Sequence, residues 1–256
     1  MATERKDISI ETTLASLRRR GLEARLAENR KAARDMVLAM VPASSSVGAG
    51  GSATLRQIGI MEELVRRGNT VLDTQSSSLW EGVLAEDRMA ALEKLRKQAM
   101  TCDFFLSSTN VVTSDGRLLN VDGSGNRVAG MFFGPKRVIV VAGRNKIAPN
   151  LEVAMDRLRN VISPVHMAWI TPNKKTPCVV TGKCNDCWSH ERSCCVTTII
   201  EGRPYYTHMT VILVDEDLGL GWDPDWPEER IKAMMEQYQA AITPVKIVSR
   251  GQRASE

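Results

Sequence analysis

Five of the six cysteines lie in one short segment, and their thiols are the groups in this chain best suited to bind a metal. Cys178, Cys184, Cys187 and Cys194 follow the spacing C-x5-C-x2-C-x6-C, and Cys195 adjoins the last of them. The C-x2-C pair can direct two thiolates to one ion or cluster, and the flanking loops are long enough to bring further thiols. We therefore predict a metal site at Cys178, Cys184, Cys187 and Cys194, with Cys195 as an alternative last ligand.

The spacing leaves the metal open between an iron-sulfur cluster and zinc, because it matches no standard ferredoxin pattern. Basic residues around the thiols would favour thiolates and offset the negative charge of a cluster. They are Lys174, Lys175, Lys183 and Arg192. We expect an iron-sulfur cluster of the 4Fe-4S type, with structural zinc as the alternative. Three ligands would leave one iron open to substrate, whereas four would restrict the cluster to electron transfer or structure.

A glycine-rich stretch forms a second candidate site. Gly48-x-Gly50-Gly51-Ser52 follows a short predicted strand and precedes a predicted helix. Backbone N–H groups at such a junction attract phosphate or carboxylate, although a tight turn that needs positive φ angles explains the glycines equally well. We expect Gly48, Gly50, Gly51 and Ser52 to bind a small anionic metabolite.

Polar loops after other predicted strands support this pocket, since ligands of open α/β sheets collect at the carboxyl ends of the strands. The loops contribute Asn110, then Asn120 to Arg127, then Gly143 to Lys146. Asp and Asn also make ordinary turns, so the prediction rests on the group of loops. The predicted substrate-binding residues are Asn110, Asn120, Asn126 and Arg127, and the catalytic candidates are Asp122 and Lys146, as acid, base or positive charge.

The elements that must position these residues alternate between strand and helix, which predicts an α/β fold with an open, mainly parallel sheet covered by helices on both faces. Four segments are expected: an N-terminal helical segment (1–41), an α/β core with the glycine loop (42–170), the cysteine-rich loop (171–195), and C-terminal strands with a final helix (196–256). Short apolar runs predict strands at 103–107, 118–121, 137–142, 196–200 and 209–215. Helical periodicity predicts helices within 10–40, 84–99 and 151–161, and Asp225 to Glu228 resembles a capping box before the last helix.

Composition narrows the setting. The chain has 256 residues and a net charge of +4, with acids interleaved among the bases, so nucleic acid is not implied. Its longest apolar runs fall far short of the roughly 20 residues that cross a bilayer, and the first 18 residues do not read as a signal peptide. We expect a cytoplasmic protein, in which clustered cysteines favour metal binding over disulfides. The N-terminal helices suggest a homodimer.

Taken together, these motifs resemble the LUD (lactate utilisation) domain family, in its cysteine-containing branch. The resemblance covers about residues 20 to 220. The stretches that carry it are Gly48–Arg56, Ser108–Gly116, Asn120–Arg127, Gly134–Lys146 and Lys175–Cys194.

This resemblance implies a fold similar to that of ribose-5-phosphate isomerase and the CoA transferases. It also implies action on a hydroxy or keto acid, as an iron-sulfur oxidoreductase or lyase, and other iron-sulfur subunits of a lactate-oxidising system as partners. Two alternatives remain: a ligand-binding or assembly module with structural zinc, and a phosphate-sugar or CoA-type enzyme. The glutamate nucleophile of the CoA transferases has no match in this chain, which counts against the CoA version.

Overall fold

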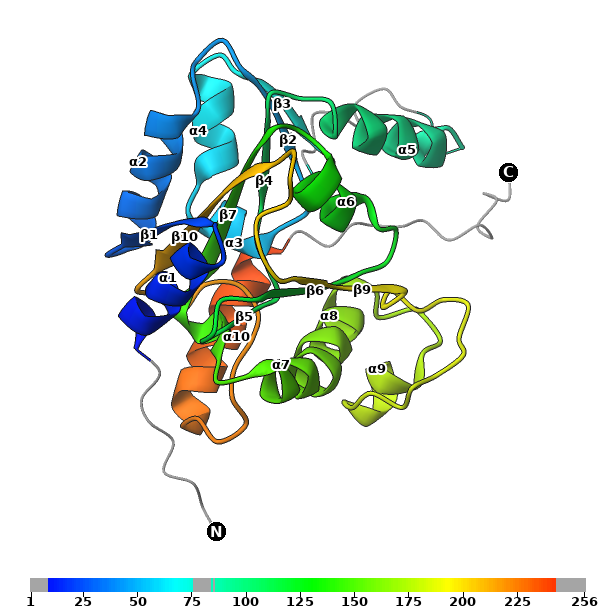
Figure 1. Ribbon diagram of the computed structural model, residues 1–256. Coiled ribbons are helices and arrows are strands. Elements are labelled where there is room, and N and C mark those ends of the chain that lie inside the picture. The colour runs from blue at the N-terminus through cyan, green and yellow to red at the C-terminus, as the bar shows by residue number, and fades with distance from the viewer. Residues whose placement is uncertain (1–8, 76–83, 85, 243–256) are drawn as a thin grey trace.

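A six-stranded parallel sheet forms the centre of the computed structural model, which describes residues 9–75, 84 and 86–242 (Figure 1). The strands run in the order β1-β10-β7-β4-β2-β3, and every pairing is parallel. Their bounds are β1 Glu23–Ala27, β2 Ser46–Ala49, β3 Thr70–Asp73, β4 Phe104–Ser107, β7 Arg137–Gly143 and β10 His208–Val214. The apolar runs of β7 and β10 are buried along almost their whole length, as in sheets covered on both faces.

Helices cover both faces of this sheet. On one face, Val37 and Leu64 pack with Val47 and Ile139 of the strands. On the other face, Leu17 and Met131 belong to a second core cluster with further strand residues. The first face is covered by α2 (Arg30–Met40), α3 (Ala53–Gln57) and α4 (Ile60–Arg66), and the second by α1 (Ile10–Arg19), α5 (Arg88–Ala99) and α6 (Asn126–Phe133).

A smaller four-stranded sheet packs beneath the large one. Its order is β8-β5-β6-β9, with antiparallel pairs on both sides of β6. Leu118 on one of its faces joins the core of the large sheet, while Leu119 on the other packs against a group of helices. The strands are β5 Val111–Thr113, β6 Leu118–Asp122, β8 Ile147–Ala148 and β9 Val196–Ile200. The helices include α7 Leu151–Arg157, the π-helical turn η3 Leu158–Ile162, α8 Ser163–Ile170 and α10 Glu228–Ala241.

The predicted fold class is confirmed, and the short apolar runs form strands at the expected places. The segment 1–41, expected to be helical throughout, also contains β1. This strand was not predicted, because its five residues fit the helical period of the two helices beside it. Residues 1–8 of that segment lie outside the described residues. Leu84 precedes α5, which begins at Arg88.

The last helix begins at Glu228 with Pro227 at its N-cap and no side-chain cap, so the predicted capping box is wrong. None of the helices described is long and apolar enough to cross a membrane.

The connections of the sheet create a crevice at its carboxyl edge. From β2 the chain passes through α3 and α4 on one face to reach β3, whereas from β4 it passes through α6 on the other face to reach β7. Neighbouring strands whose connections leave in opposite directions open the crevice in which doubly wound sheets bind ligands. Residues that follow β2, β4 and β7 therefore meet at one place.

Candidate functional site

Lys146 is the buried side chain around which these strand ends converge. It ends the 3-10 turn η2 (Arg144–Lys146), which follows β7, and only 4% of its surface is exposed. Its Nζ donates to Ser108 Oγ at 2.7 Å, to Thr54 Oγ1 at 3.0 Å and to the Thr109 carbonyl at 3.0 Å. Since these partners follow β2 and β4, the ammonium group ties three strand ends together.

The electrostatic setting of Lys146 is unusual for a lysine, because none of its three acceptors is a carboxylate. Burial, together with the positive charge of Arg127, lowers the pKa of Lys146 from 10.5 to about 7. Near neutral pH this side chain can therefore either hold or release a proton, which a surface lysine cannot.

Arg127 is the second buried cation of the crevice, and its terminal N–H donors are engaged within the protein. Nη1 donates to Asn120 Oδ1 at 2.7 Å and to the Ser108 carbonyl at 3.2 Å. Nη2 donates to Asn110 Oδ1 at 3.0 Å and to the Val121 carbonyl at 2.7 Å. Burial lowers the pKa of Arg127, and Asp122 opposes that shift. Arg127 thus supplies charge to the crevice and fixes the two predicted amides.

Asp122 and Asn120 each keep a buried polar atom without a hydrogen-bond partner among the described residues. Asp122 Oδ1 accepts from the backbone N–H groups of Ser124 and Gly125, whereas Oδ2 lies 3.5 Å from Arg127 Nε and makes no hydrogen bond. Asn120 Nδ2 is likewise unpaired, although the residue is fully buried. Unpaired buried groups are uncommon and often mark places where water or a ligand binds.

The glycines of the loop allow neighbouring residues to pack directly against its backbone. A Cβ at Gly50 would lie 2.5 Å from Arg127 Cγ, and a Cβ at Gly48 would lie 2.2 Å from the Ala99 carbonyl oxygen. The Gly50 N–H donates to the Leu106 carbonyl. Gly48 therefore lets α5 pack on β2, and Gly50 lets the loop pack on Arg127.

Ser52, Gly51 and Asn126 occupy the neighbouring positions. Ser52 caps α3, since its Oγ accepts from Leu55 N at 3.2 Å. Gly51 packs against the Gln75 side chain, where a Cβ would lie 2.8 Å from Nε2. Asn126 is the first residue of α6.

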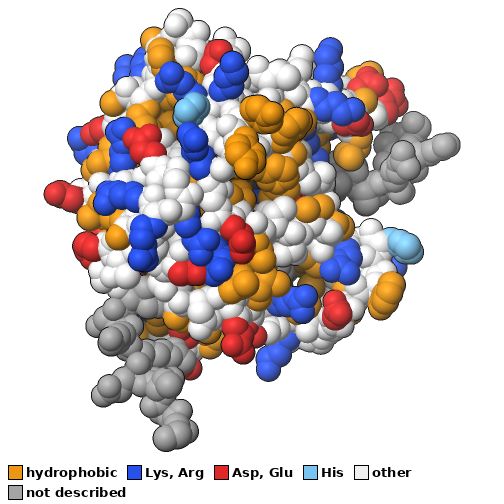
Figure 2. Space-filling view, in the orientation of Figure 1, with side chains coloured by type: hydrophobic (Ala, Val, Ile, Leu, Met, Phe, Trp, Pro, Cys, Tyr) orange, Lys and Arg blue, Asp and Glu red, His pale blue; other side chains and the backbone are white. Residues whose placement is uncertain are grey.

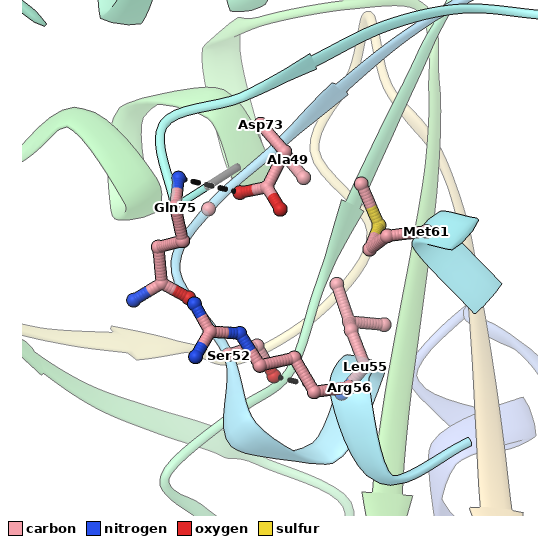
Figure 3. Close-up of a pocket in the computed structure, with 8 residues that line it drawn as sticks. Ala49, Ser52, Leu55, Arg56, Met61, Asp73 and Gln75 are labelled. Carbon is pink, nitrogen blue, oxygen red and sulfur yellow. Dashed lines mark hydrogen bonds between the residues drawn. The ribbon is translucent and has the colours of Figure 1, made fainter. Parts of the chain in front are cut away.

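A small pocket lies beside the glycine loop, lined so closely that it has essentially no room for a water molecule (Figure 3). Asp73 and Arg56 project into it from different elements, and Arg56 extends toward the Gln75 side chain (Figure 3). Gln75 N donates to Asp73 Oδ1 at 3.0 Å. Burial raises the pKa of Asp73, an effect that this hydrogen bond and the charge of Arg56 reduce. The pocket thus combines a carboxyl group, a guanidinium and a serine at the end of β2.

His166 of α8 lies near the same network. The residue is exposed to solvent, although many protein atoms lie around its ring. This enclosure and the positive charges of Arg127 and Lys174 lower the pKa of His166 to about 4. Its Nδ1 lies 3.4 Å from the Tyr238 hydroxyl. His166 is therefore neutral at physiological pH.

The cysteine segment reaches the crevice through its last residues. Cys195 N donates to the Asp122 carbonyl at 3.0 Å, and β9 then pairs with β6 from Val196 onward. Arg192 donates to the carbonyls of Cys187 and Cys194, and its pKa is raised first by a hydrogen bond with Cys194 and by the charges of the nearby thiols. The segment is thus anchored to the residue whose carboxylate lies beside Arg127.

The thiols themselves are dispersed over the segment. Cys178 lies in the short helix α9 (Pro177–Thr181), while Cys184, Cys187 and Cys194 lie in irregular backbone. All four are partly exposed and unbridged, and Cys195 is exposed. Across 9–75, 84 and 86–242, no three His, Cys, Asp or Glu side chains are placed to hold one metal ion. The donor set suits a metal, but gathering it at one ion requires the segment to change conformation.

Comparison with known proteins places this geometry in a family. A model of the LUD domain matches residues 10–214, from the start of α1 to the end of β10. The chain belongs to the LUD domain family. A solved DUF162 family protein from Deinococcus radiodurans is 14% identical to it, with a TM-score of 0.45 over 83% of this chain and 99% of that one. No curated protein matches the sequence.

The LUD domain contains both the crevice and the cysteine segment, since all of these residues precede 214. Helix α10 follows the matched region and still braces the crevice. Arg56 Nη1 donates to the Ala241 carbonyl at 3.0 Å, and Gln57 Nε2 donates to the Gln237 carbonyl at 3.3 Å.

Several residues that pack around Lys146 were not predicted, and one of them, Gly219, lies beyond the matched region. Thr54 and Ser108 hold Lys146, and Gly219 packs against it, with a φ of +72° and a hypothetical Cβ 2.8 Å from Nζ. Ser108 directly follows the predicted strand that ends at 107, so its position at a strand end was a usable signal. Gly219 gave none, because its loop approaches Lys146 only in the folded chain.

Proposed function

We propose that this LUD domain protein binds and acts on a small anionic metabolite of the hydroxy or keto acid class in the crevice at the carboxyl edge of the large sheet. The observation that carries the proposal is Lys146, a buried amine without a carboxylate partner, whose pKa lies near 7. Buried Arg127 adds a second positive charge that Asp122 meets only at 3.5 Å. Excess positive charge at a sheet crevice favours an anion.

Lys146 would supply proton transfer. In its neutral form the amine can accept a proton from a hydroxyl group, and as an ammonium it can donate one to a carbonyl oxygen. A general acid or base works best with a pKa near the working pH, which the surroundings of Lys146 provide. The hydroxyl groups of Thr54 and Ser108 hold the amine in place during that exchange.

Ligand binding tests the proposal. The unfolding temperature of the wild-type protein should rise when lactate, pyruvate or glycolate is added, because a ligand that binds only the folded state stabilises it. The Lys146→Met variant should lose this response, while Lys136→Met, which removes an exposed lysine, should keep it. Equal stabilisation of both variants, or none of the wild type by any of the three acids, would refute the site.

We also propose that Cys178, Cys184, Cys187 and Cys194 bind an iron-sulfur cluster. Support comes from the four thiols on one segment and from Arg192, whose positive charge lies among them. When bound, the cluster would supply electron transfer or, with three cysteine ligands, a Lewis-acidic iron.

Anaerobic purification decides between metals. An absorption band near 400 nm with iron and sulfide in matching amounts is expected, together with its loss in a variant that lacks Cys184 and Cys187. A Cys102→Ala variant is the matched control, because Cys102 is buried far from the segment in sequence. Stoichiometric zinc in a colourless protein would refute the cluster and favour the assembly module.

A further inference from the structure

Large apolar side chains gather on one face of the molecule, away from the crevice. Phe133 is 77% exposed at the end of α6, and Tyr205 is 98% exposed on the segment that leads to β10. Phe132, Ile199 and Tyr206 are exposed as well. Figure 2 shows apolar side chains near the middle of this face, over α6 and that segment. Contiguous apolar surface of this kind marks interaction sites.

An open groove of about 440 Å³ lies beside these side chains. Phe132, Ile199 and Pro204 contribute to its walls. Thr207 Oγ1 donates to the Phe132 carbonyl at 3.2 Å, which fixes the two sides to each other. Arg203 N donates to the Arg20 carbonyl at 3.1 Å, which anchors the segment of Pro204 to the end of α1. The groove is thus already formed in the isolated chain.

Strand β9 forms one margin of the groove and is the last strand of the smaller sheet. Within the described part of the chain it pairs with β6 alone, so the backbone N–H and C=O groups of its other edge have no strand partner. Thr197 and Ile199 are exposed alternately along it. An edge strand with an adjoining apolar groove can accept an extended polypeptide as an additional strand.

Charges around the groove select the kind of polypeptide. Lys136 and Arg137 follow Phe133, and Arg203 precedes Tyr205, all three exposed. Glu201, the only acid within 132–137 and 199–208, is held by Arg117 at 3.1 Å. A second copy that paired through the same edge would bring two basic rims together, which electrostatic repulsion disfavours.

We propose that the groove and the free edge of β9 form a docking surface for an extended acidic segment of another protein, in which apolar side chains alternate with Asp or Glu. The alternate apolar side chains would contact Phe132, Ile199 and Tyr205, while the acids meet Lys136 and Arg203. This inference is independent of the proposed function, because it uses no residue of the crevice.

Selection from a display library of random peptides tests the proposal on the full chain. Enriched peptides should alternate apolar and acidic residues, and binding of a synthetic copy should weaken about tenfold or more in Ile199→Lys and in Tyr205→Ser. The control Val65→Lys changes an exposed apolar residue on α4, outside the groove, and should bind normally. Unchanged thermal unfolding shows that each variant folds.

Charge reversal gives the second readout. The double variant Lys136→Glu with Arg203→Glu should reject the acidic peptides and favour lysine-containing ones. Enrichment of peptides that lack acidic residues would overturn the proposal. So would a peptide affinity of Ile199→Lys equal to that of the wild type. So would a dimer in sedimentation that Ile199→Lys dissociates, because a second copy would then occupy the edge.

Discussion

Replacing Lys146 by Met should remove a pH dependence of stability that only this lysine creates. In the unfolded chain a lysine keeps its proton up to about pH 10.5, whereas in the folded protein Lys146 releases it at about 7. Between these values the unfolded state binds more protons, so a rise in pH favours the folded state. Below pH 7 both states hold the proton, and folding bears the full cost of burying the charge.

The magnitude follows from the pKa difference. Each pKa unit corresponds to about 1.4 kcal/mol, so a shift from 10.5 to about 7 amounts to about 5 kcal/mol of instability at low pH. Of this, about 3 kcal/mol should be recovered between pH 6 and pH 9. Met fills a similar volume without a charge. The substitution removes the hydrogen bonds from Lys146 to Thr54, Ser108 and Thr109, and each lost bond costs about 1 kcal/mol. This cost does not vary with pH over this range.

Urea unfolding of both proteins at pH 6, 7, 8 and 9 measures the effect. The free energy of unfolding of the wild type, minus that of Lys146→Met, should rise by about 3 kcal/mol from pH 6 to pH 9. Titration of cysteines and histidines cancels in this difference, and Lys136→Met should give a constant difference. If the Lys146→Met difference is also constant, Lys146 stays charged in the folded protein and cannot exchange a proton as proposed.

Three further substitutions test the packing of the site through urea unfolding. Gly219→Ala should destabilise by about 2 kcal/mol or more, because its Cβ meets Lys146 at a positive φ, whereas Gly182→Ala, also at positive φ but with open space, should cost only about 1 kcal/mol. Gly50→Ala should destabilise by about 1 to 3 kcal/mol and reduce acid binding, since its Cβ would displace Arg127. Asn150→Ala should cost about 1 kcal/mol, because Asn150 caps α7. Unaltered stability in any of the three would contradict the contacts described.

The sequence predicted the site best where chain order determines position. Lys146 and Asn110 follow predicted strands of the large sheet, whose carboxyl ends meet in space, so their grouping could be inferred. Asn120 joins them from β6 of the four-stranded sheet, which this rule does not cover. The role of Gly48 could not, because whether a glycine binds a ligand or admits a helix depends on what packs against it, here the Ala99 carbonyl. The four-stranded sheet was missed because runs such as 196–200 show a strand without showing its partner.

The parallel pairing of β1 with β10 has a consequence for how the chain is made. Residues 23–27 align with residues 210–214, and β10 inserts between β1 and β7. During synthesis β1 is finished early but has no neighbour until most of the chain has been translated. The long separation between these strands predicts slow folding, with β1 and the edge of β7 exposed to wrong partners in the meantime. Chaperones that shield strand edges should therefore assist this protein most before β10 has been translated.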